Sequence, residues 1–357
     1  FSEMKVFEQE EKAEFFSQGG MKYGVRSFES PAFPGYIPEE QLSQFTLSTL
    51  APSVFVEIRK TVGIEESDFS NALENGDLEP FSTNSKSGAS FYFSRQLPLI
   101  IKIVGSDEYR FLANSIREYH DHVLNNPSTL LARVVAMHLL QFHSKAFHII
   151  VMEAVWSQPG SSCCHKAPPQ FMHLIYDLKG STKGRSASAK DIALSPKPSQ
   201  TATILKDNDL RLSQRVFEIG YSLRRQYLSQ LKKDVSFLVR LGVLDYSMLV
   251  GVHIPRLSGT TKILSRRVDD DNDDFVLVER SKQSEENTGV WRGPIWSKDK
   301  QEVYHMGIID YLVPYGLRKR GEYFLKSKVQ GFGDTISVLP PKEYGERFLD
   351  FITKVLC

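Results

Sequence analysis

Apolar residues recur at helical spacing in several parts of the chain. Helices are therefore expected over four segments of the first 125 residues: 1–18, 52–62, 67–74 and 107–125. In the last of these, Leu112, Ile116 and Tyr119 follow one another at intervals of four and three residues, which places them on one helix face. The Asn-Asn-Pro sequence that follows is expected to end this helix.

Four runs rich in aromatic and β-branched residues predict strands. They cover residues 89–94, 98–104, 146–155 and 173–178. The first two runs are separated by only three residues, so we expect adjacent strands around a short turn. We expect the last two runs to form a second strand pair, joined by a loop rich in Pro, Ser and Gly.

The second half of the chain begins with a long helical pattern. Apolar residues recur at helical spacing from Ser213 to Leu241, and Gly242 stands where a glycine commonly ends a helix. Further elements are expected at 243–254, at 305–313 and in a helix beginning at Pro341 with Tyr344, Phe348, Phe351 and Val355 on one face. The polar, acidic segment 256–302 is expected to be a partly disordered insertion between core elements.

The composition is that of an ordinary globular protein, with 41% hydrophobic and 24% charged residues among 357. No apolar run reaches the ~18–20 residues that a membrane-spanning helix needs. Lys and Arg (44) nearly balance Asp and Glu (43), which argues against a strongly basic nucleic-acid-binding domain. Three cysteines fit a reducing compartment, and Cys163, Cys164 and His165 lack the CxxC spacing of a zinc site. Because residue 1 is Phe, we take the sequence as a fragment and infer nothing about a targeting signal.

The charges are nevertheless unevenly distributed. Residues 315–328 carry five basic side chains and one Glu, and residues 177–190 carry four basic side chains and one Asp. Either patch alone is compatible with a solvated loop. In 315–328, however, the basic residues are interleaved with Tyr, Leu and Phe, a composition typical of a segment that docks on an anionic membrane surface.

Lys102 lies inside the apolar run PLIIKIV, where a strand lysine either faces solvent or points into a cleft. The preceding SKSGASFYF, residues 85–93, is a Gly/Ser turn that leads into a strand, the arrangement that covers ATP phosphates in kinase-like folds. With a single glycine, it matches neither GxGxxG nor the phosphate-loop pattern of nucleotide hydrolases, so the turn by itself is weak evidence.

Two single aspartates stand in apolar surroundings, Asp245 in LDYSML and Asp310 in GIIDYL. Each alone is compatible with a turn former or a helix cap. A phosphotransfer site, however, needs one carboxylate to orient or deprotonate the attacking hydroxyl and another to hold magnesium. Together with Lys102 and the basic segment DLKGST, the two aspartates predict such a site.

Several motifs occur in an order and spacing that identify a family. They are SGASFYF with PLIIKIV, YHDHVLNNPSTLLAR, IIVME, YDLKGSTKGR, ILKDNDL, LDYSMLVGVH, GIIDYL and GDTISVLPPKEYGERF. On these motifs, the chain from about residue 45 to its end resembles the phosphatidylinositol phosphate kinases, closest to the type I phosphatidylinositol 4-phosphate 5-kinases. The HRD, DFG and APE segments of protein kinases do not occur.

The resemblance implies an α+β, two-lobed, kinase-like lipid kinase fold. It has an antiparallel sheet with helices in the N-lobe and a smaller sheet with helices in the C-lobe. The expected organisation is a partly helical extension at 1–44, the N-lobe at 45–178, and the C-lobe at 179–357 with the insert at about 256–302 and the specificity loop at 313–335.

The resemblance also implies roles for individual residues. Lys102 is the ATP-binding lysine, Asp245 the catalytic aspartate and Asp310 the metal-binding aspartate; all three are expected to be needed for catalysis. The phosphate-covering part of the ATP site is Ser87, Gly88, Ala89 and Ser90, and Lys179 lies near both the nucleotide and the lipid headgroup. The expected substrate-binding residues are Lys179, Lys183, Arg185, Lys206, Lys319, Arg320 and Glu322.

The implied activity is transfer of the γ-phosphoryl group of ATP, with Mg²⁺, to the 5-hydroxyl of phosphatidylinositol 4-phosphate in an anionic membrane, giving phosphatidylinositol 4,5-bisphosphate. Glu322 favours this isomer, because the type II kinases have a small apolar residue at its position. The alternatives are a 4-kinase acting on the 5-phosphate and a catalytically weak phosphoinositide-binding scaffold. We expect a cytoplasmic protein, peripheral at the plasma membrane, with no nucleic-acid partner, and leave a homodimer open.

Overall fold

The computed structural model describes residues 45–74, 78–81, 91–142, 145–156, 172–187, 203–255, 293–315 and 339–357. The chain splits into two compact units, each described by itself below. Unit 1 comprises residues 1–125 and 132–168, and unit 2 comprises 126–131 and 169–357.

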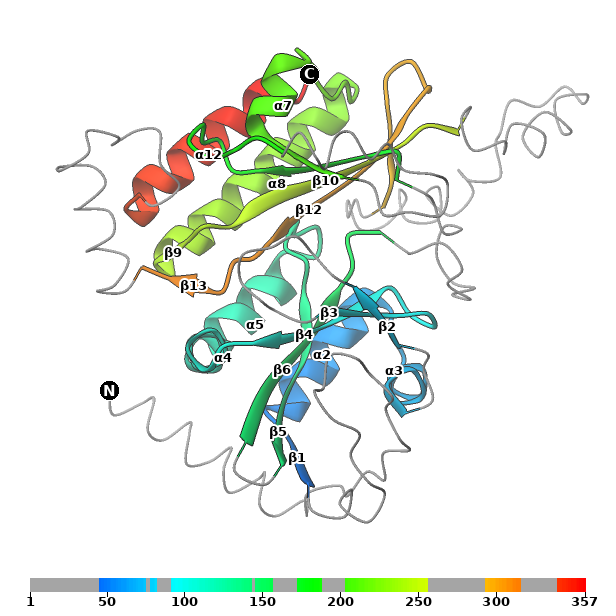
Figure 1. Cartoon of the computed structure of the whole chain (residues 1–357), viewed down its shortest axis with the longest axis vertical. Coiled ribbons are helices and arrows are strands. Elements are labelled where there is room, and N and C mark those ends of the chain that lie inside the picture. The colour runs from blue at the N-terminus through cyan, green and yellow to red at the C-terminus, as the bar shows by residue number, and fades with distance from the viewer. Residues whose placement is uncertain are drawn as a thin grey trace, which may run out of the picture. The chain divides into compact units, whose positions relative to one another are not determined.

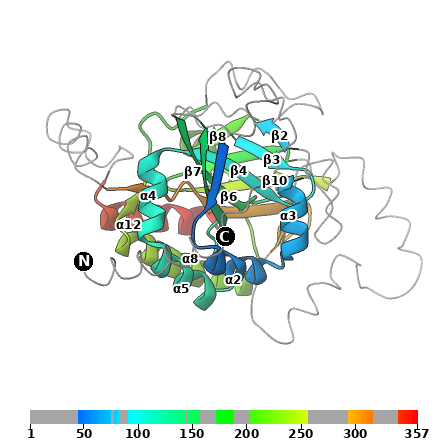
Figure 2. The same cartoon turned by 90° about the horizontal axis from the view of Figure 1, so that it is seen from below.

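Unit 1 is built on a six-stranded antiparallel sheet with the strand order β1-β5-β6-β4-β3-β2 (Figure 1). Its strands are β1 (Phe45–Thr49), β2 (Leu78–Phe81), β3 (Phe91–Ser94), β4 (Leu99–Val104), β5 (Val134–Phe142) and β6 (Lys145–Glu153). Its helices are α2 (Pro52–Val62), α3 (Glu66–Glu74), α4 (Ser106–Asn114) and α5 (Ile116–Asn125). Helix α2 packs against β5 and lies beside α5 (Figure 2).

The sequence pattern predicts the helical segments of unit 1 and its strands β3, β4 and β6, but not β1, β2 or β5. Helix α2 has the predicted bounds, and β3 and β4 pair around a short turn as expected. The helix predicted over 107–125 is divided at Ser115, whose φ of −108° leaves the helical region. Serine favours such breaks, because its hydroxyl competes for backbone hydrogen bonds.

The predicted pairing of the strands at 146–155 and 173–178 is wrong. The first of these strands, β6, pairs instead with β4 and with β5, and β5 has no counterpart among the predicted elements. The second, β7 (Leu174–Leu178), belongs to the sheet of unit 2. Unit 2 therefore begins before residue 178, where the sequence-based boundary between the lobes lies.

Two arginines are buried between the helices and the sheet of unit 1. Arg133, the residue directly before β5, donates from Nε to Glu153 Oε2 at 2.6 Å and from Nη2 to Oε1 at 3.0 Å. Arg59 on α2 makes a two-point contact with Glu66 at 2.7 Å and also donates to the Val135 carbonyl at 2.7 Å. These charge-assisted hydrogen bonds compensate for the loss of hydration and tie α2 to β5.

Unit 2 contains a smaller, five-stranded sheet with the order β11-β12-β10-β7-β8, in which only the β7–β8 pair is parallel, and a two-stranded ribbon of β13 and β9. Besides β7, its strands are β8 (Ile204–Lys206), β9 (Val243–Leu244), β10 (Ser247–His253), β11 (Ile295–Trp296), β12 (Val303–Ile309) and β13 (Val313–Pro314). Its helices are α7 (Asp207–Leu212), α8 (Tyr221–Arg240) and α12 (Pro341–Val355). The two units together have the expected α+β class, with a larger antiparallel sheet and a smaller sheet.

Helices α8 and α12 lie side by side in both views (Figures 1 and 2). They approach closely at Gly345 of α12, where an added Cβ would lie 2.7 Å from the Val239 side chain. Helix α12 begins at Pro341, as predicted, and buries Tyr344 and Phe348. None of the helices in the described part of the chain is both long enough and apolar enough to cross a membrane.

The long helix of unit 2 starts later than the predicted Ser213. Before Tyr221, the backbone of Phe217 bonds to the C-terminal residues instead of forming a helix. The Phe217 N–H donates to the Val355 carbonyl at 2.7 Å, and the Phe217 carbonyl accepts from the Cys357 N–H at 2.9 Å. A tertiary contact thus overrides the local helical pattern. At the other end, Gly242 has a φ of 69°, as expected for a glycine after a helix.

Several predicted features lie outside the described residues. They are the helix at 1–18, residues 256–292 of the insert, and residues 316–335 of the specificity loop. The last part of the insert, 293–302, is described and contains β11 and a turn closed by Ser297, whose hydroxyl donates to Asp299 at 2.6 Å. This part of the predicted insertion belongs to the folded sheet.

Residues 126–131 join unit 2 through a buried carboxylate on α8. Asp234, which is fully buried, accepts hydrogen bonds from the Thr129 hydroxyl at 2.7 Å and the Leu130 N–H at 2.8 Å. The Leu130 carbonyl in turn accepts from the Ile308 N–H on β12 at 2.7 Å. This short segment is therefore part of the core of unit 2 although it interrupts unit 1 in the sequence.

A prediction concerns His138 on β5. Its Nδ1 lies 3.0 Å from Thr49 Oγ1, whereas its Nε2 is buried and has no hydrogen-bond partner among the described residues. Burial, aided by the charge of Arg59, lowers the His138 pKa to about 4. The unfolded chain, with an ordinary pKa near 6.5, then binds the extra proton first, so the free energy of unfolding falls as the pH drops from about 6.5 to 4.

The size of this loss is on the order of 3 kcal/mol, from 1.4 kcal/mol per pKa unit. His138→Asn keeps a polar group near Thr49 but cannot titrate. Denaturant unfolding at several pH values should give a flatter pH dependence for this variant than for the wild-type chain between pH 6.5 and 4. Parallel curves for the two proteins would contradict the assignment.

Candidate active site

The strands of unit 2 converge at one edge of its sheet. In the antiparallel register, Leu178, the last residue of β7, pairs with Met248 near the start of β10. On the other side of β10, its first residue, Ser247, pairs with Ile309 at the end of β12. The chain therefore leaves β7, enters β10 and leaves β12 at the same edge, called here the site edge.

Three residues predicted for catalysis or substrate binding, Lys179, Asp245 and Asp310, lie at the site edge, directly beyond these strand ends. The Lys179 ammonium donates to the Asp245 carbonyl at 2.6 Å and to its Oδ1 at 2.8 Å. The pair is half-buried, with side-chain exposures of 12% for Lys179 and 32% for Asp245. Both charges are held in a defined position while the carboxylate stays accessible to solvent.

Asp245 and Asp310 share an uncommon backbone conformation. Their φ values are 69° and 59°, in the left-handed region that costs a residue with a side chain about 1–2 kcal/mol. Such strain persists where the surrounding structure holds it, and it is concentrated at functional sites. Ala51, Gln214 and Lys300 also have a positive φ, so what sets the two aspartates apart is this conformation together with their place at the site edge.

The site edge fits a magnesium ion bound together with phosphate. Within the described ranges, no group of three or more His, Cys, Asp or Glu residues gathers to hold a metal. Magnesium does not need such a cage, because it commonly uses one or two carboxylates, substrate phosphates and water. The exposed Asp310, directly after β12, and the half-buried Asp245, shortly before β10, supply carboxylates of this kind at the site edge.

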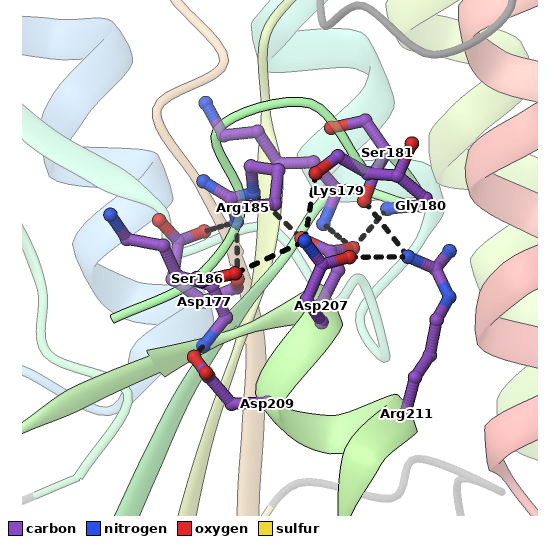
Figure 3. Close-up of polar contacts among 12 residues, drawn as sticks. Asp177, Lys179, Gly180, Ser181, Arg185, Ser186, Asp207, Asp209 and Arg211 are labelled. Atoms are coloured by element: carbon purple, nitrogen blue, oxygen red, sulfur yellow. Dashed lines mark hydrogen bonds and ion pairs between the residues drawn. The ribbon is translucent and has the colours of Figure 1, made fainter. Parts of the chain in front are cut away.

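The turn after β7 is organised by Asp207, the first residue of α7. Its Oδ1 accepts the N–H groups of Lys179 at 3.0 Å and Gly180 at 2.6 Å, and its Oδ2 accepts from Arg185 Nε at 2.6 Å (Figure 3). Asp207 is fully buried. The sequence pattern predicts no role for Asp207, although this residue lies in the motif ILKDNDL.

Arg185 was expected to bind substrate, but its setting does not fit that role. It is only 8% exposed, and besides Asp207 it contacts the carbonyl and the carboxylate of Asp177. Burial by itself raises the Asp177 pKa, but the charges of Arg185 and Lys179 outweigh it and hold the pKa below its usual range. The guanidinium is thus committed to internal ion pairs that shape the turn.

The remaining predicted residues have different settings. Lys183 is exposed on the turn, and Lys206 is half-buried at the start of α7, where its N–H donates to Asp209 at 2.8 Å. Lys102 lies in unit 1 on β4 and is 7% exposed. Its Nζ lies 5.5 Å from the centre of the Phe91 ring. The solvent-facing alternative for Lys102 is therefore wrong.

Other predicted residues fall outside the described part of the chain. They are Ser87, Gly88, Ala89 and Ser90 of the phosphate-covering turn, Lys319, Arg320 and Glu322 of the specificity loop, and the Cys163, Cys164 and His165 cluster. Their roles stay predictions. Lys179, Asp245 and Asp310 lie at one edge of the sheet of unit 2. Lys102 belongs to unit 1, and its contacts are described within that unit.

Helix α12 supports the turn after β7 from behind. Gly180 has a φ of 74°, and a Cβ added there would lie 3.1 Å from both the Arg347 carbonyl and the Phe351 Cβ. Arg211 of α7 stacks over the Phe351 ring at 4.8 Å and donates to the Ser181 carbonyl at 3.1 Å (Figure 3). The turn is therefore fixed by packing on α12 as well as by Asp207.

Comparison with known proteins identifies the relatives of this chain. Residues 72–355 match the family model described as phosphatidylinositol-4-phosphate 5-kinase. Phosphatidylinositol 5-phosphate 4-kinase type-2 alpha from Sus scrofa is 30% identical over 340 residues, covering 89% of this chain and 80% of the relative. The type-2 beta enzyme from Homo sapiens is 27% identical over 341 residues, covering 88% and 78%.

A third relative is longer. A protein named "Probable phosphatidylinositol phosphate kinase" from Dictyostelium discoideum is 29% identical over 359 residues, which cover 87% of this chain. The chain spans about half the length of that relative, 48%.

The glycines of the turn after β7 allow a matched test of its packing. Gly184 has a φ of 69°, like Gly180, but nothing lies within 4 Å of a Cβ added there. Gly184→Ala should lower the free energy of unfolding by about 1 kcal/mol, the cost of the left-handed conformation alone. Gly180→Ala should cost roughly 2–3 kcal/mol, because it also crowds α12. Equal losses for the two variants in denaturant unfolding would show that α12 does not constrain the turn.

Proposed function

Since this chain belongs to the phosphatidylinositol phosphate kinase family, a family of lipid kinases, we propose that it transfers the γ-phosphoryl group of ATP to the inositol ring of a phosphatidylinositol monophosphate. The observation that carries the proposal is the site edge. There, a lysine ammonium is held against one aspartate, Asp245, and a second aspartate, Asp310, directly follows the neighbouring strand β12. This is a combination that phosphoryl transfer requires.

The proposed roles follow from the chemistry of the residues. The inositol hydroxyl oxygen forms a bond to the γ-phosphorus while the bond to the leaving ADP oxygen breaks, and the hydroxyl proton passes to the Asp245 carboxylate. Lys179 and Lys102 balance negative charge on phosphate groups. Asp310 would hold magnesium, which when bound neutralises phosphate charge.

For the acceptor, we propose the 5-hydroxyl of phosphatidylinositol 4-phosphate. The support is Glu322, because the resemblance to the type I kinases implies an acidic residue at this position in kinases with this specificity. The second candidate is the 4-hydroxyl of phosphatidylinositol 5-phosphate, because the relatives from Sus scrofa and Homo sapiens are named 5-phosphate 4-kinases.

The substrate of either reaction is a membrane lipid. We propose that the protein is cytoplasmic, acts peripherally at the plasma membrane and docks through residues 315–328. The five basic side chains of this segment attract an anionic surface, and its Tyr, Leu and Phe residues suit the membrane interface. A scaffold that binds phosphoinositides without catalysis is disfavoured, since Lys102, Asp245 and Asp310 are all present.

A labelling assay tests the reaction. Labelled ATP is offered with each phosphatidylinositol monophosphate in vesicles, and the position of the new phosphate is mapped. Asp245→Asn, Asp310→Asn and Lys102→Ala should each lower turnover about 100-fold or more, because each removes stabilisation of charge in the transition state. EDTA should stop transfer. Undiminished turnover in a folded Asp310→Asn protein would remove the metal assignment.

The same assay decides between the two acceptors. A product labelled at the 5-position, with a preference for the 4-phosphate lipid that weakens in Glu322→Ala, supports the first candidate. Labelling at the 4-position establishes the second. Absence of transfer to every lipid, by a folded protein that binds phosphoinositide vesicles, would instead favour the scaffold.

Membrane docking has its own test. Replacing Lys319 and Arg320 by Glu should sharply reduce binding to vesicles that contain anionic lipid, since each basic residue near such a surface contributes about 1 kcal/mol. ATP binding in solution should change little. Raising the salt concentration should weaken wild-type binding in a similar way, because the Debye length is only ~8 Å at physiological ionic strength. Unchanged vesicle binding at low salt would leave residues 177–190 as the next candidate.

A further inference from the structure

The Asp207 carboxylate touches the turn that carries Lys179 at two consecutive backbone groups. Its Oδ1 accepts the N–H of Lys179 at 3.0 Å and that of Gly180 at 2.6 Å. We propose that Asp207 is a positioning residue, which aims the Lys179 ammonium at Asp245 by fixing the backbone from which that side chain extends. This inference rests on the proposed kinase function.

The contacts leave the Lys179 backbone little freedom. One oxygen of a fully buried carboxylate binds two successive N–H groups, and the other binds Arg185 Nε at 2.6 Å, which prevents the carboxylate from rotating. The Lys179 side chain then reaches the Asp245 carbonyl at 2.6 Å and its Oδ1 at 2.8 Å. Lys179 thus connects Asp207, bonded to its backbone N–H, with the candidate catalytic aspartate, bonded to its ammonium.

The alternative is that Asp207 only stabilises the fold. The two roles differ in how a change at Asp207 affects catalysis. In a positioning role, the effect passes through Lys179. The chain offers a matched control in Asp234, another fully buried aspartate of unit 2, which also accepts a backbone N–H and a side-chain hydroxyl, from Leu130 and Thr129. Neither of these contacts involves Lys179.

The first experiment compares turnover in Asp207→Asn and Asp234→Asn, with thermal unfolding measured in parallel. An amide cannot accept from both the N–H pair and Arg185, so the turn should lose its fixed position. Asp207→Asn should lower kcat about tenfold to a hundredfold with a smaller change in KM for ATP. Asp234→Asn should lower the unfolding temperature but keep kcat within about twofold. Equal kcat losses in the two variants would overturn the proposal.

A double variant tests whether the effect passes through Lys179. Lys179→Ala removes the group that Asp207 is proposed to aim, so adding Asp207→Asn to it should lower kcat by less than about twofold further. A full additional loss would mean that Asp207 acts by another route. In case Asp207→Asn does not fold, Asp207→Glu retains the charge beside Arg185 but lengthens the side chain. Wild-type kcat in that variant would also contradict the proposal.

A chemical measurement separates this inference from the kinase activity itself. Acetylation of the intact protein by an N-hydroxysuccinimide ester is mapped by mass spectrometry, with the exposed Lys183 as internal reference. The half-buried, ion-paired Lys179 should react more slowly than Lys183 in the wild-type chain. Asp207→Asn should raise the Lys179 to Lys183 ratio several-fold, and Asp234→Asn should not. An unchanged ratio overturns the positioning role, whereas failure of phosphate transfer in the wild-type protein overturns only the proposed function.

Discussion

The register of β10 against its two neighbours is the constraint on which the candidate site depends. Since β10 pairs with β7 on one side and β12 on the other, the residues just outside the three strands share one edge. Shifting either pairing by one residue would turn every side chain of that strand to the opposite face. The buried residues of β10 and β12 oppose such a shift, and so the core of unit 2 holds Lys179, Asp245 and Asp310 in place.

Buried arginines with carboxylate partners hold the chain within each unit, although Glu66, the partner of Arg59, is itself 49% exposed. Arg133 with Glu153, Arg59 with Glu66 and Arg185 with Asp207 each place an arginine away from water with a two-point or multiply bonded carboxylate partner. Such pairs contribute modestly to net stability, but removing one partner leaves an uncompensated charge and commonly costs 3–5 kcal/mol. Their main effect is therefore to disfavour alternative arrangements of the chain. An active site needs such a single, defined arrangement of its residues.

The sequence predicts the elements that are locally determined and misses those set by distant contacts. Helices α2 and α12 follow from apolar spacing and a well-placed proline, and Lys102, Asp245 and Asp310 stand out because each interrupts an apolar run. Strand β5 and the late start of α8 depend on partners far away in the sequence, which no local pattern reveals. Asp207 was missed for a related reason: its partners lie 22 to 28 residues before it, and only the folded turn brings them to it.

The two left-handed aspartates lie at the same edge of the sheet, and this shared location supports their functional assignment. Unit 2 uses glycine, which adopts this conformation without strain, at Gly180, Gly184 and Gly242, but it also has Gln214 and Lys300 in it, with φ values of 50° and 56°. At Asp245 and Asp310, the same conformation carries a carboxylate instead, although glycine would relieve about 1–2 kcal/mol at each. Aspartate tolerates this region better than most residues, yet that tolerance alone does not account for two such positions meeting at one edge of a sheet. A need for the carboxylates themselves does account for it.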